Sequence, residues 1–124
     1  MANNGLTKSY VAESAIVPFS LIKYGAADYG AAQGAAATDK LYGVSTEVAS
    51  AIGERFDVIL EGIADLKING VVARGDFITS DATGLGITAA PAVGVNNRII
   101  GIAQVSGVAG DIIPVQLQPG SVQG

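Results

Sequence analysis

The side chains of this sequence that could take part in chemistry are a small set of carboxylates. Asp76 with Asp81, and Asp57 with Glu61, are close enough in sequence to act as an acid and a base or to hold a calcium ion. Neither pair has the ligand density of a calcium-binding loop, and Glu61 falls on the solvent side of an expected strand. We therefore interpret Glu61 as a solvated carboxylate and expect neither pair to form an acid–base or calcium site.

Two glycine clusters and one Arg-Gly-Asp tripeptide are the remaining short motifs. The clusters, at 84–86 and 107–110, would need a following helix and usually a lysine to hold phosphate, and neither has them. Arg74-Gly75-Asp76 matches an integrin ligand, but Gly-Asp beside a strand is also what a tight turn requires. We predict a turn at this tripeptide and no phosphate site.

The chain contains no cysteine and no histidine. A disulfide, a thiolate zinc site, a cysteine nucleophile and an imidazole base are therefore all excluded. Serine catalysis would need a base placed by the fold, and no local motif marks one. We expect a protein that is not an enzyme and that uses no cofactor, metal ion or small-molecule substrate.

The seven lysines and arginines are scattered singly, and the formal net charge is −4. Nucleic-acid binding needs clustered basic residues, so we expect no nucleic-acid partner. No apolar run approaches the roughly 18 residues of a membrane span, so we expect no membrane partner. After Asp81 the only charged residues are Arg98 and Asp111, and such an apolar C-terminal third indicates contacts with other chains.

The clearest structural pattern lies between Phe56 and Ile68. Every even position there is apolar or glycine, whereas most odd positions are polar, as in an antiparallel strand with one face in a core. The pair Asn69-Gly70 follows, and it favours a type I′ turn. We predict a hairpin at this pair, with Ile68 opposite Val71.

Glycine occurs 17 times and strong helix-forming runs are few, so short strands and tight turns are expected. The 124 residues suffice for one domain with a single core. We predict a mainly β fold, a small β-barrel or sandwich, with a loop or single helical turn at 48–53. The predicted boundaries are an extended N-terminal arm at 1–17, one β-rich domain at 18–120 and a tail at 121–124.

The arm has two interpretations, because residues 1–9 are polar and without a period. It is either a flexible start that leads into an edge strand, or an arm that becomes ordered by pairing with a neighbouring chain. Pro18 cannot donate a backbone hydrogen bond, so it belongs at a sheet edge or at the start of a strand.

Two segments, starting at Lys40 and at Arg98, resemble each other at a spacing of 57 or 58 residues. Gly43 matches Gly101, and the Gly-acid pair at 53–54 matches the one at 110–111. The alternating apolar residues that follow also match: Phe56, Val58 and Leu60 correspond to Ile113, Val115 and Leu117. We predict an internal repeat with pseudo-two-fold symmetry, in which two similar units cover the same core. The alternative is chance similarity between segments rich in glycine, valine and alanine.

Four motifs carry a resemblance to a known family. They are Gly-Val-Ser at 43–45, Val-x-Leu-x-Gly at 58–62, Val-x-Arg-Gly-Asp-x-x-Thr at 72–79 and Arg-Ile-Ile-Gly-Ile-Ala at 98–103. With them, residues 21–117 resemble the capsid decoration (cement) proteins of tailed bacteriophages, which are similar to the lambda-type head decoration proteins. These motifs build a fold and indicate no catalytic chemistry.

The resemblance implies a structural protein on the exterior of the capsid in the virion, made in the host cytoplasm. It implies a homotrimer that bridges subunits of its partner, the major capsid protein, and so stabilises the mature head. It also implies an N-terminal arm that binds the capsid. The residues that occupy this place are Leu6, Tyr10, Val11, Ile16 and Val17.

The alternative function is a tail-associated or receptor-binding β-domain of a phage particle, which would bind a host glycan or protein. Exposed aromatic side chains around a groove would favour it. The four tyrosines and three phenylalanines are dispersed along the sequence, and this favours the capsid protein.

Overall fold

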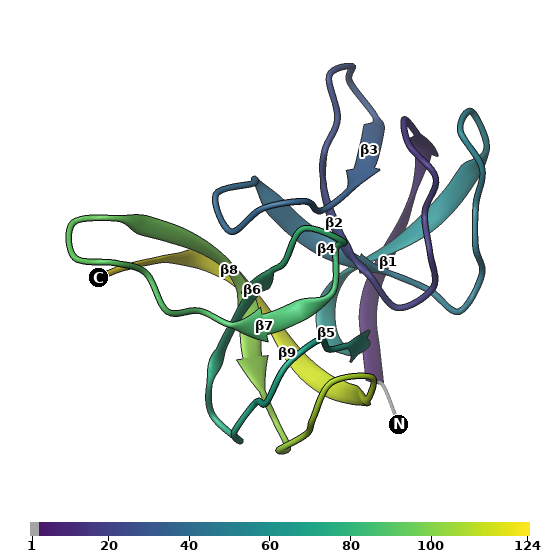
Figure 1. Cartoon of the computed structure of the whole chain (residues 1–124). Coiled ribbons are helices and arrows are strands. Elements are labelled where there is room, and N and C mark those ends of the chain that lie inside the picture. The colour runs from purple at the N-terminus through teal and green to yellow at the C-terminus, as the bar shows by residue number, and fades with distance from the viewer. Residues whose placement is uncertain (1–2) are drawn as a thin grey trace.

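The computed structural model describes residues 3–124, which form nine β-strands and no helix (Figure 1). Within this range there is accordingly no helix that is long and apolar enough to cross a membrane. The predicted mainly β fold is confirmed. The strands are β1 (Asn3–Ala12), β2 (Leu21–Tyr24), β3 (Gly30–Gln33), β4 (Leu41–Ser45), β5 (Arg55–Lys67), β6 (Phe77–Ser80), β7 (Gly86–Thr88), β8 (Asn96–Ala103) and β9 (Ile112–Gln123).

The first five strands close into a barrel, which we call the first barrel. Their order is β1-β3-β2-β4-β5, and β1 also pairs with β5, so the last strand meets the first. β1 runs parallel to β3, with Val11 opposite Gly30, and antiparallel to β5, with Tyr10 opposite Phe56. Closure satisfies the strand edges that an open sheet would leave unpaired.

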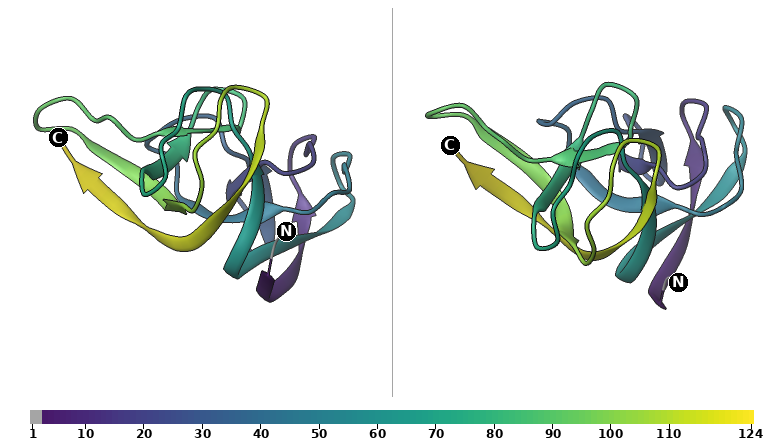
Figure 2. Two further views of the ribbon diagram at one scale, coloured as in Figure 1. Left: turned by 90° about the horizontal axis from the view of Figure 1, so that it is seen from below. Right: turned by 60° about the horizontal axis from the view of Figure 1, so that its bottom comes forward.

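Strand β5 continues beyond the first barrel into a second unit, which we call the second ring. There it pairs with β9, and the order continues through β8, β6 and β7. An isolated parallel bridge between Ile68 and Gly86 brings β7 back to the end of β5. The 13-residue β5 is thus shared by both units, and β8 and β9 extend from the second ring as a long ribbon (Figure 2).

The strand pairing confirms the internal repeat. Strands β3, β2, β4 and β5 of the first barrel correspond, in this order, to β7, β6, β8 and β9 of the second ring. The two matching turns also contain the same type of hydrogen bond, from a backbone N–H to the acidic side chain three residues later. The Glu54 carboxylate accepts from the N–H of Ala51 at 2.6 Å, and the Asp111 carboxylate accepts from the N–H of Val108 at 2.9 Å. In each turn the glycine before the acidic residue has a positive φ.

Two hydrophobic clusters fill the molecule where a single core was expected. The cluster inside the first barrel contains Tyr10, Ala12, Ile16, Ile22, Ala31, Tyr42, Phe56 and Val58. The larger cluster combines the second ring with residues of β2, β4 and β5: Leu21, Leu41, Val44, Ile59, Ala64, Leu66, Ile68, Val72, Ile78, Ile100, Ala103, Ile113 and Val115. The prediction of one core is therefore wrong, because the shared strand borders two enclosed spaces.

The hairpin predicted at Asn69-Gly70 is also wrong. Ile68 pairs with Gly86 and Val72 pairs with Gly107, so the flanks of the Asn-Gly pair bind two other segments and not each other. The N–H of Asn69 donates to the carbonyl oxygen of Gly86 at 2.8 Å. The preference of Asn-Gly for a type I′ turn is outweighed by closure of the second ring, because closure requires the end of β5 to pair with β7.

The Arg74-Gly75-Asp76 tripeptide forms the predicted turn. Gly75 has a φ of 92°, and the Asp76 carboxylate accepts from the N–H of Ala73 at 2.9 Å. The N–H of Arg74 donates to the hydroxyl of Ser106 at 3.1 Å, which ties this turn to the loop between β8 and β9. The tripeptide therefore has a structural role in the second ring.

The C-terminal strand is longer than its composition indicates. β9 extends to Gln123, and residues 121–123, which were predicted as part of a tail, pair with residues 96–98 of β8. This pairing is made by backbone groups, so it leaves no apolar pattern in the sequence.

Gly43 and Gly101 occupy equivalent positions at which a neighbouring strand passes closely. A Cβ atom at Gly43 would lie 2.7 Å from the carbonyl oxygen of Ile59, and one at Gly101 would clash with the carbonyl of Gln116. A Cβ atom at Gly120, in contrast, would meet its nearest atoms at 3.9 Å. Of these three glycines, Gly43 and Gly101 therefore have no room for a side chain, because the backbone of a neighbouring strand passes too close.

We expect Gly43→Ala and Gly101→Ala each to lower the free energy of unfolding by about 1–3 kcal/mol, the usual cost of overpacking. Gly120→Ala serves as the matched control and should change this free energy by less than about 0.5 kcal/mol. Urea denaturation measures all three variants. Equal stability of the three would contradict the close strand approach in both units.

Candidate functional site

The five residues predicted to form a capsid-binding arm do not lie on one surface. Tyr10 and Ile16 are buried in the cluster of the first barrel, and Val11 is half-buried. Leu6 and Val17 are exposed. These last two are therefore the members of the set whose side chains are available to a partner.

Strand β1, which contains most of the predicted arm, is part of the barrel wall. It pairs with β5 from Asn3 opposite Ile63 to Val11 opposite Arg55. Over these residues the pairing partner is thus the chain's own β5. Residues 1 and 2 of the predicted arm lie outside the described residues.

A groove lies where the first barrel meets the second ring, and we call it the junction groove. Its volume is about 410 Å³, and it is lined by Val17, Pro18, Phe19, Gln33, Lys67, Thr83, Leu85 and Ile112. Among these lining residues Lys67 is the charged one, and it is exposed. Val17 is the single residue of the predicted arm that contributes to this groove.

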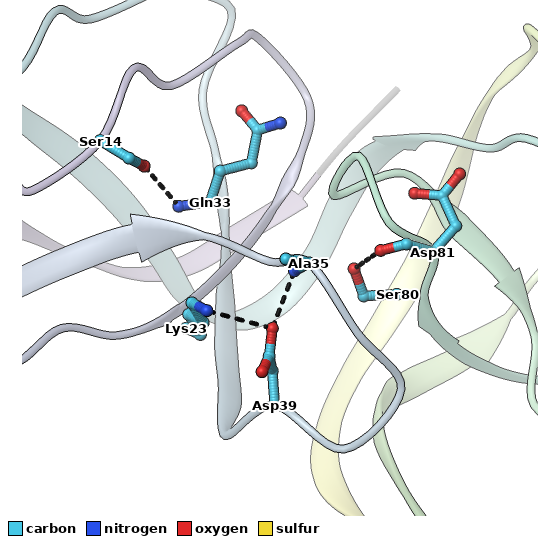
Figure 3. Close-up of polar contacts among 7 residues, drawn as sticks. All are labelled: Ser14, Lys23, Gln33, Ala35, Asp39, Ser80 and Asp81. Atoms are coloured by element: carbon cyan, nitrogen blue, oxygen red, sulfur yellow. Dashed lines mark hydrogen bonds and ion pairs between the residues drawn. The ribbon is translucent and has the colours of Figure 1, made fainter.

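The side chain of Gln33 connects the two walls of the junction groove. Its carbonyl oxygen accepts from the N–H of Val17 at 2.9 Å, and its amide donates to the carbonyl oxygen of Thr83 at 2.6 Å. The N–H of Gln33 donates to the hydroxyl of Ser14 at 3.1 Å (Figure 3). These bonds hold residues from both units in place, so the groove is preformed.

Phe19, at the edge of the junction groove, has a backbone conformation that is rare for a bulky residue. Its φ is 56°, whereas the equivalent position in the second ring is Gly75, with a φ of 92°. A non-glycine residue in this conformation costs of order 1–3 kcal/mol. The N–H of Lys67 donates to the carbonyl oxygen of Phe19 at 2.9 Å and helps to hold it there. An aromatic ring is thus kept in the groove at an energetic cost.

An ion pair orders the loop between β3 and β4. Lys23 Nζ lies 3.3 Å from a carboxylate oxygen of Asp39, and the same oxygen accepts from the N–H of Ala35 at 2.8 Å (Figure 3). Asp39 therefore closes a local turn.

The carboxylates considered as an acid–base or calcium pair, Asp76 and Asp81, belong to separate hydrogen-bond networks. Asp76 accepts from the N–H of Ala73 and from the hydroxyl of Thr88, at 2.9 and 3.0 Å. Asp81 accepts from the side-chain amide of Asn69 at 2.7 Å. Among residues 3–124, no three His, Cys, Asp or Glu side chains gather in a way that could hold a metal ion.

Asp81 holds together the turn between β6 and β7. Partial burial disfavours its charged form, but hydrogen bonds from Asn69, Thr83 and Leu85 outweigh this effect and lower the pKa of the Asp81 carboxyl. One oxygen accepts from the N–H groups of Thr83 and Leu85, at 2.8 and 3.0 Å. Folding therefore stabilises the ionised form of this carboxyl relative to its protonated form.

Exposed apolar side chains are spread over the second ring. The large ones are Val71, Phe77, Val93, Val95, Val105, Val108 and Ile112. Val93 is 96% exposed and lies in the loop between β7 and β8, which is hydrogen-bonded to the C-terminal Gly124 (Figure 1). Single exposed apolar side chains are normal on protein surfaces, so among these residues the pair Val93 and Val95, in one loop, is the candidate contact.

Comparison with known proteins gives a structural match and no sequence match. No protein-family model and no curated protein matches the chain. The fold is similar to that of the N base of the head fibre gp8.5 of bacteriophage phi29, as seen in its crystal structure. The TM-score is 0.68 at 14% sequence identity, over 96% of this chain and 98% of that chain. This chain and the solved N base therefore share a fold over nearly all of both chains.

The lowered pKa of Asp81 predicts how stability depends on pH. Because this pKa is lower in the folded chain than in the unfolded chain, the ionised carboxylate favours folding above the ordinary carboxyl pKa of about 3.9. The contribution is lost as pH falls through the lowered pKa. Asp81→Asn should reduce the free energy of unfolding at neutral pH and flatten its decline as pH falls below about 4.

Urea denaturation over this pH range checks the prediction. Glu47→Gln, which removes an exposed carboxylate, is the matched control and should leave both the stability and its pH dependence unchanged. A pH profile of Asp81→Asn that parallels the wild-type profile would show that Asp81 does not stabilise the turn through its charge.

Proposed function

We propose that this chain is a structural protein of a phage particle that binds the outside of the mature head. It stabilises the head by bridging subunits of the major capsid protein as a homotrimer. The observation that carries this proposal is the fold shared, over nearly the whole chain, with the base of a phage head fibre. The resemblance of residues 21–117 to capsid decoration proteins points to the same part of the particle.

The surface of the second ring supports binding to another protein. It exposes several valines and Phe77, and charge is scarce after Asp81. Val93 and Val95 lie two residues apart in the loop between β7 and β8, and we propose this pair as the apolar contact with the head. Leu6 and Val17, the exposed members of the predicted arm, are further candidate contacts on the first barrel.

The proposed mechanism is stabilisation by binding. A protein that binds the mature shell and not its precursor raises the stability of the mature shell by mass action. Linked contacts within a trimer increase the effective concentration of each one, so weak single contacts add up to firm attachment. The role requires no enzyme activity, cofactor, nucleic acid, membrane or small-molecule substrate, and it agrees with a chain that lacks histidine and cysteine.

A tail-associated or receptor-binding domain of a phage particle is the competing proposal. The two differ in the location of the protein, since a capsid protein occupies many equivalent sites on the head. They also differ in which surface is buried on the particle. Head attachment requires the apolar loop between β7 and β8 to be covered.

The double variant Val93→Asp/Val95→Asp tests the head contact. We expect it to bind mature heads at least tenfold more weakly than the wild type, because burying carboxylates in an apolar contact is costly. Val48→Asp/Ile52→Asp, which places the same charges on exposed positions of the loop between β4 and β5, is the matched control and should bind normally.

Co-sedimentation of the purified proteins with heads that lack the protein measures the occupancy. The wild type should saturate mature heads and leave precursor shells unoccupied. Equal occupancy by both double variants would remove the loop between β7 and β8 from the proposed contact, and binding to neither shell would contradict head attachment.

The proposed homotrimer is checked by light scattering of the free protein. The expected mass is about three times the chain mass of 12.4 kDa. A mass of one chain at every concentration would contradict a trimer that forms before attachment.

A further inference from the structure

All four tyrosines of the chain gather at one end of the first barrel, although they are dispersed in sequence. Tyr42 stacks on Tyr24, with ring centroids 4.0 Å apart and planes 14° apart. Tyr42 also packs against Tyr10 at 5.2 Å, and Lys8 connects Tyr10 to Tyr29. The expectation of scattered aromatic side chains is therefore wrong for the tyrosines.

Three of these tyrosines, Tyr10, Tyr24 and Tyr29, line a pocket, which we call the tyrosine pocket. Its volume is about 420 Å³, and it is lined by Lys8, Tyr10, Tyr24 and the loop of residues 25–30, which connects β2 to β3 at the end of the barrel (Figure 1). Sites for small ligands have volumes of about 300–1,000 Å³. Tyr24 is 56% exposed and Tyr29 is 65% exposed, so aromatic surface is presented to solvent at the pocket.

The wall of the tyrosine pocket is held in a fixed conformation. The Glu13 carboxylate accepts from the N–H groups of Ala26 and Ala27, at 2.8 and 3.1 Å, and these bonds lower the pKa of Glu13. Tyr29 has a φ of 59°, a conformation that is strained for an aromatic residue. Lys8 Nζ lies 5.0 Å from the Tyr29 ring centroid and steadies this ring. The pocket is thus preorganised.

The second ring shows that the fold does not need these tyrosines. The residue equivalent to Tyr10 is Leu66, and the residue equivalent to Tyr42 is Ile100, and both are buried aliphatic side chains. In place of Tyr24 the second ring has Ser80. The same strand arrangement is therefore built without any aromatic side chain at these positions.

Tyr42 lowers the stability of the fold at its position. Its hydroxyl is buried and makes no hydrogen bond within residues 3–124, and an unpaired buried hydroxyl destabilises a fold. Burial also raises the pKa of Tyr42, so the phenol stays neutral. An isoleucine, as in the second ring, would fill this space without that cost. What a tyrosine provides at position 42, and an isoleucine would not, is an aromatic ring that stacks on the ring of Tyr24.

We propose that the tyrosine pocket binds a neutral saccharide. The exposed rings of Tyr24 and Tyr29 stack against the apolar face of a sugar ring, as amphipathic aromatic side chains do in binding sites. Lys8 supplies hydrogen-bond donors and Asp28, in the same loop, supplies acceptors for the sugar hydroxyls.

The charges at the pocket argue against the other ligands that bind to aromatic surfaces. A cationic ligand would be repelled by Lys8, whose ammonium already lies over one face of the Tyr10 ring and one face of the Tyr29 ring. A nucleic acid would meet Asp28 and a chain of net charge −4. Exposed aromatic side chains around a pocket are also the feature that favours the alternative function, a phage domain that binds a host glycan. The two proposals are tested separately, because saccharide binding is measured on the free chain and head attachment is tested at Val93 and Val95 of the second ring.

Titration of the full chain with chitotetraose, cellotetraose and maltotetraose tests the inference. The chain has no tryptophan, so its intrinsic fluorescence comes mainly from the four tyrosines of the cluster and reports on the pocket directly. We expect a saturable fluorescence change with at least one tetrasaccharide, and calorimetry gives its affinity. Tyr24→Ser, which copies the second ring, should weaken binding about tenfold, the effect of one lost stacking contact.

Two controls keep this result specific. Tyr24→Phe retains the ring and should bind within about threefold of the wild type, and Ile52→Ser, at a distant exposed position, should bind normally. Circular dichroism establishes that each variant is folded. The inference is overturned if none of the three saccharides gives a saturable change, or if Tyr24→Ser binds as well as the wild type.

Discussion

The backbone pairing of β5 is the interaction on which both units of the molecule depend. Its N-terminal part completes the first barrel through β1 and β4, and its C-terminal part completes the second ring through β9. Gly62, with a φ of 93°, lies between these parts, where the register with β1 shifts. The strand passes from one enclosed space to the other, with Phe56 and Val58 in one cluster and Ala64 and Leu66 in the other.

Comparison of the two repeated units shows which features the fold requires and which occur in one unit only. Close-approach glycines, Gly-acid turns and interior apolar positions recur in both units, so they belong to the fold. The tyrosines, the strained Phe19 and the apolar loop with Val93 occur once. Features that one unit has and the other lacks are the ones that we assign to binding. In this proposal the first barrel carries the tyrosine pocket and the second ring carries the head contact.

Sequence alone predicted the elements whose signal is local. The alternation along β5, the turn at 74–76 and the repeated Gly-acid pairs all depend on neighbouring residues, and all are present. The Asn69-Gly70 hairpin failed because ring closure, a long-range constraint, outweighed a local turn preference. The first part of β1 was predicted as a flexible start or arm because residues 7–9 are polar and show no alternation, although Tyr10 and Ile16 lie 56 residues before Leu66 and Val72 and so extend the repeat. The tyrosine pocket and the junction groove unite distant residues, which composition cannot reveal.

We propose that this chain belongs to the exterior of a phage head. Electron cryomicroscopy of particles with and without the protein tests it most directly. We expect difference density on the outside of the mature head, between neighbouring subunits of the major capsid protein, with the second ring against the shell. Identical heads in the two samples, with the difference confined to the tail tip, would contradict it.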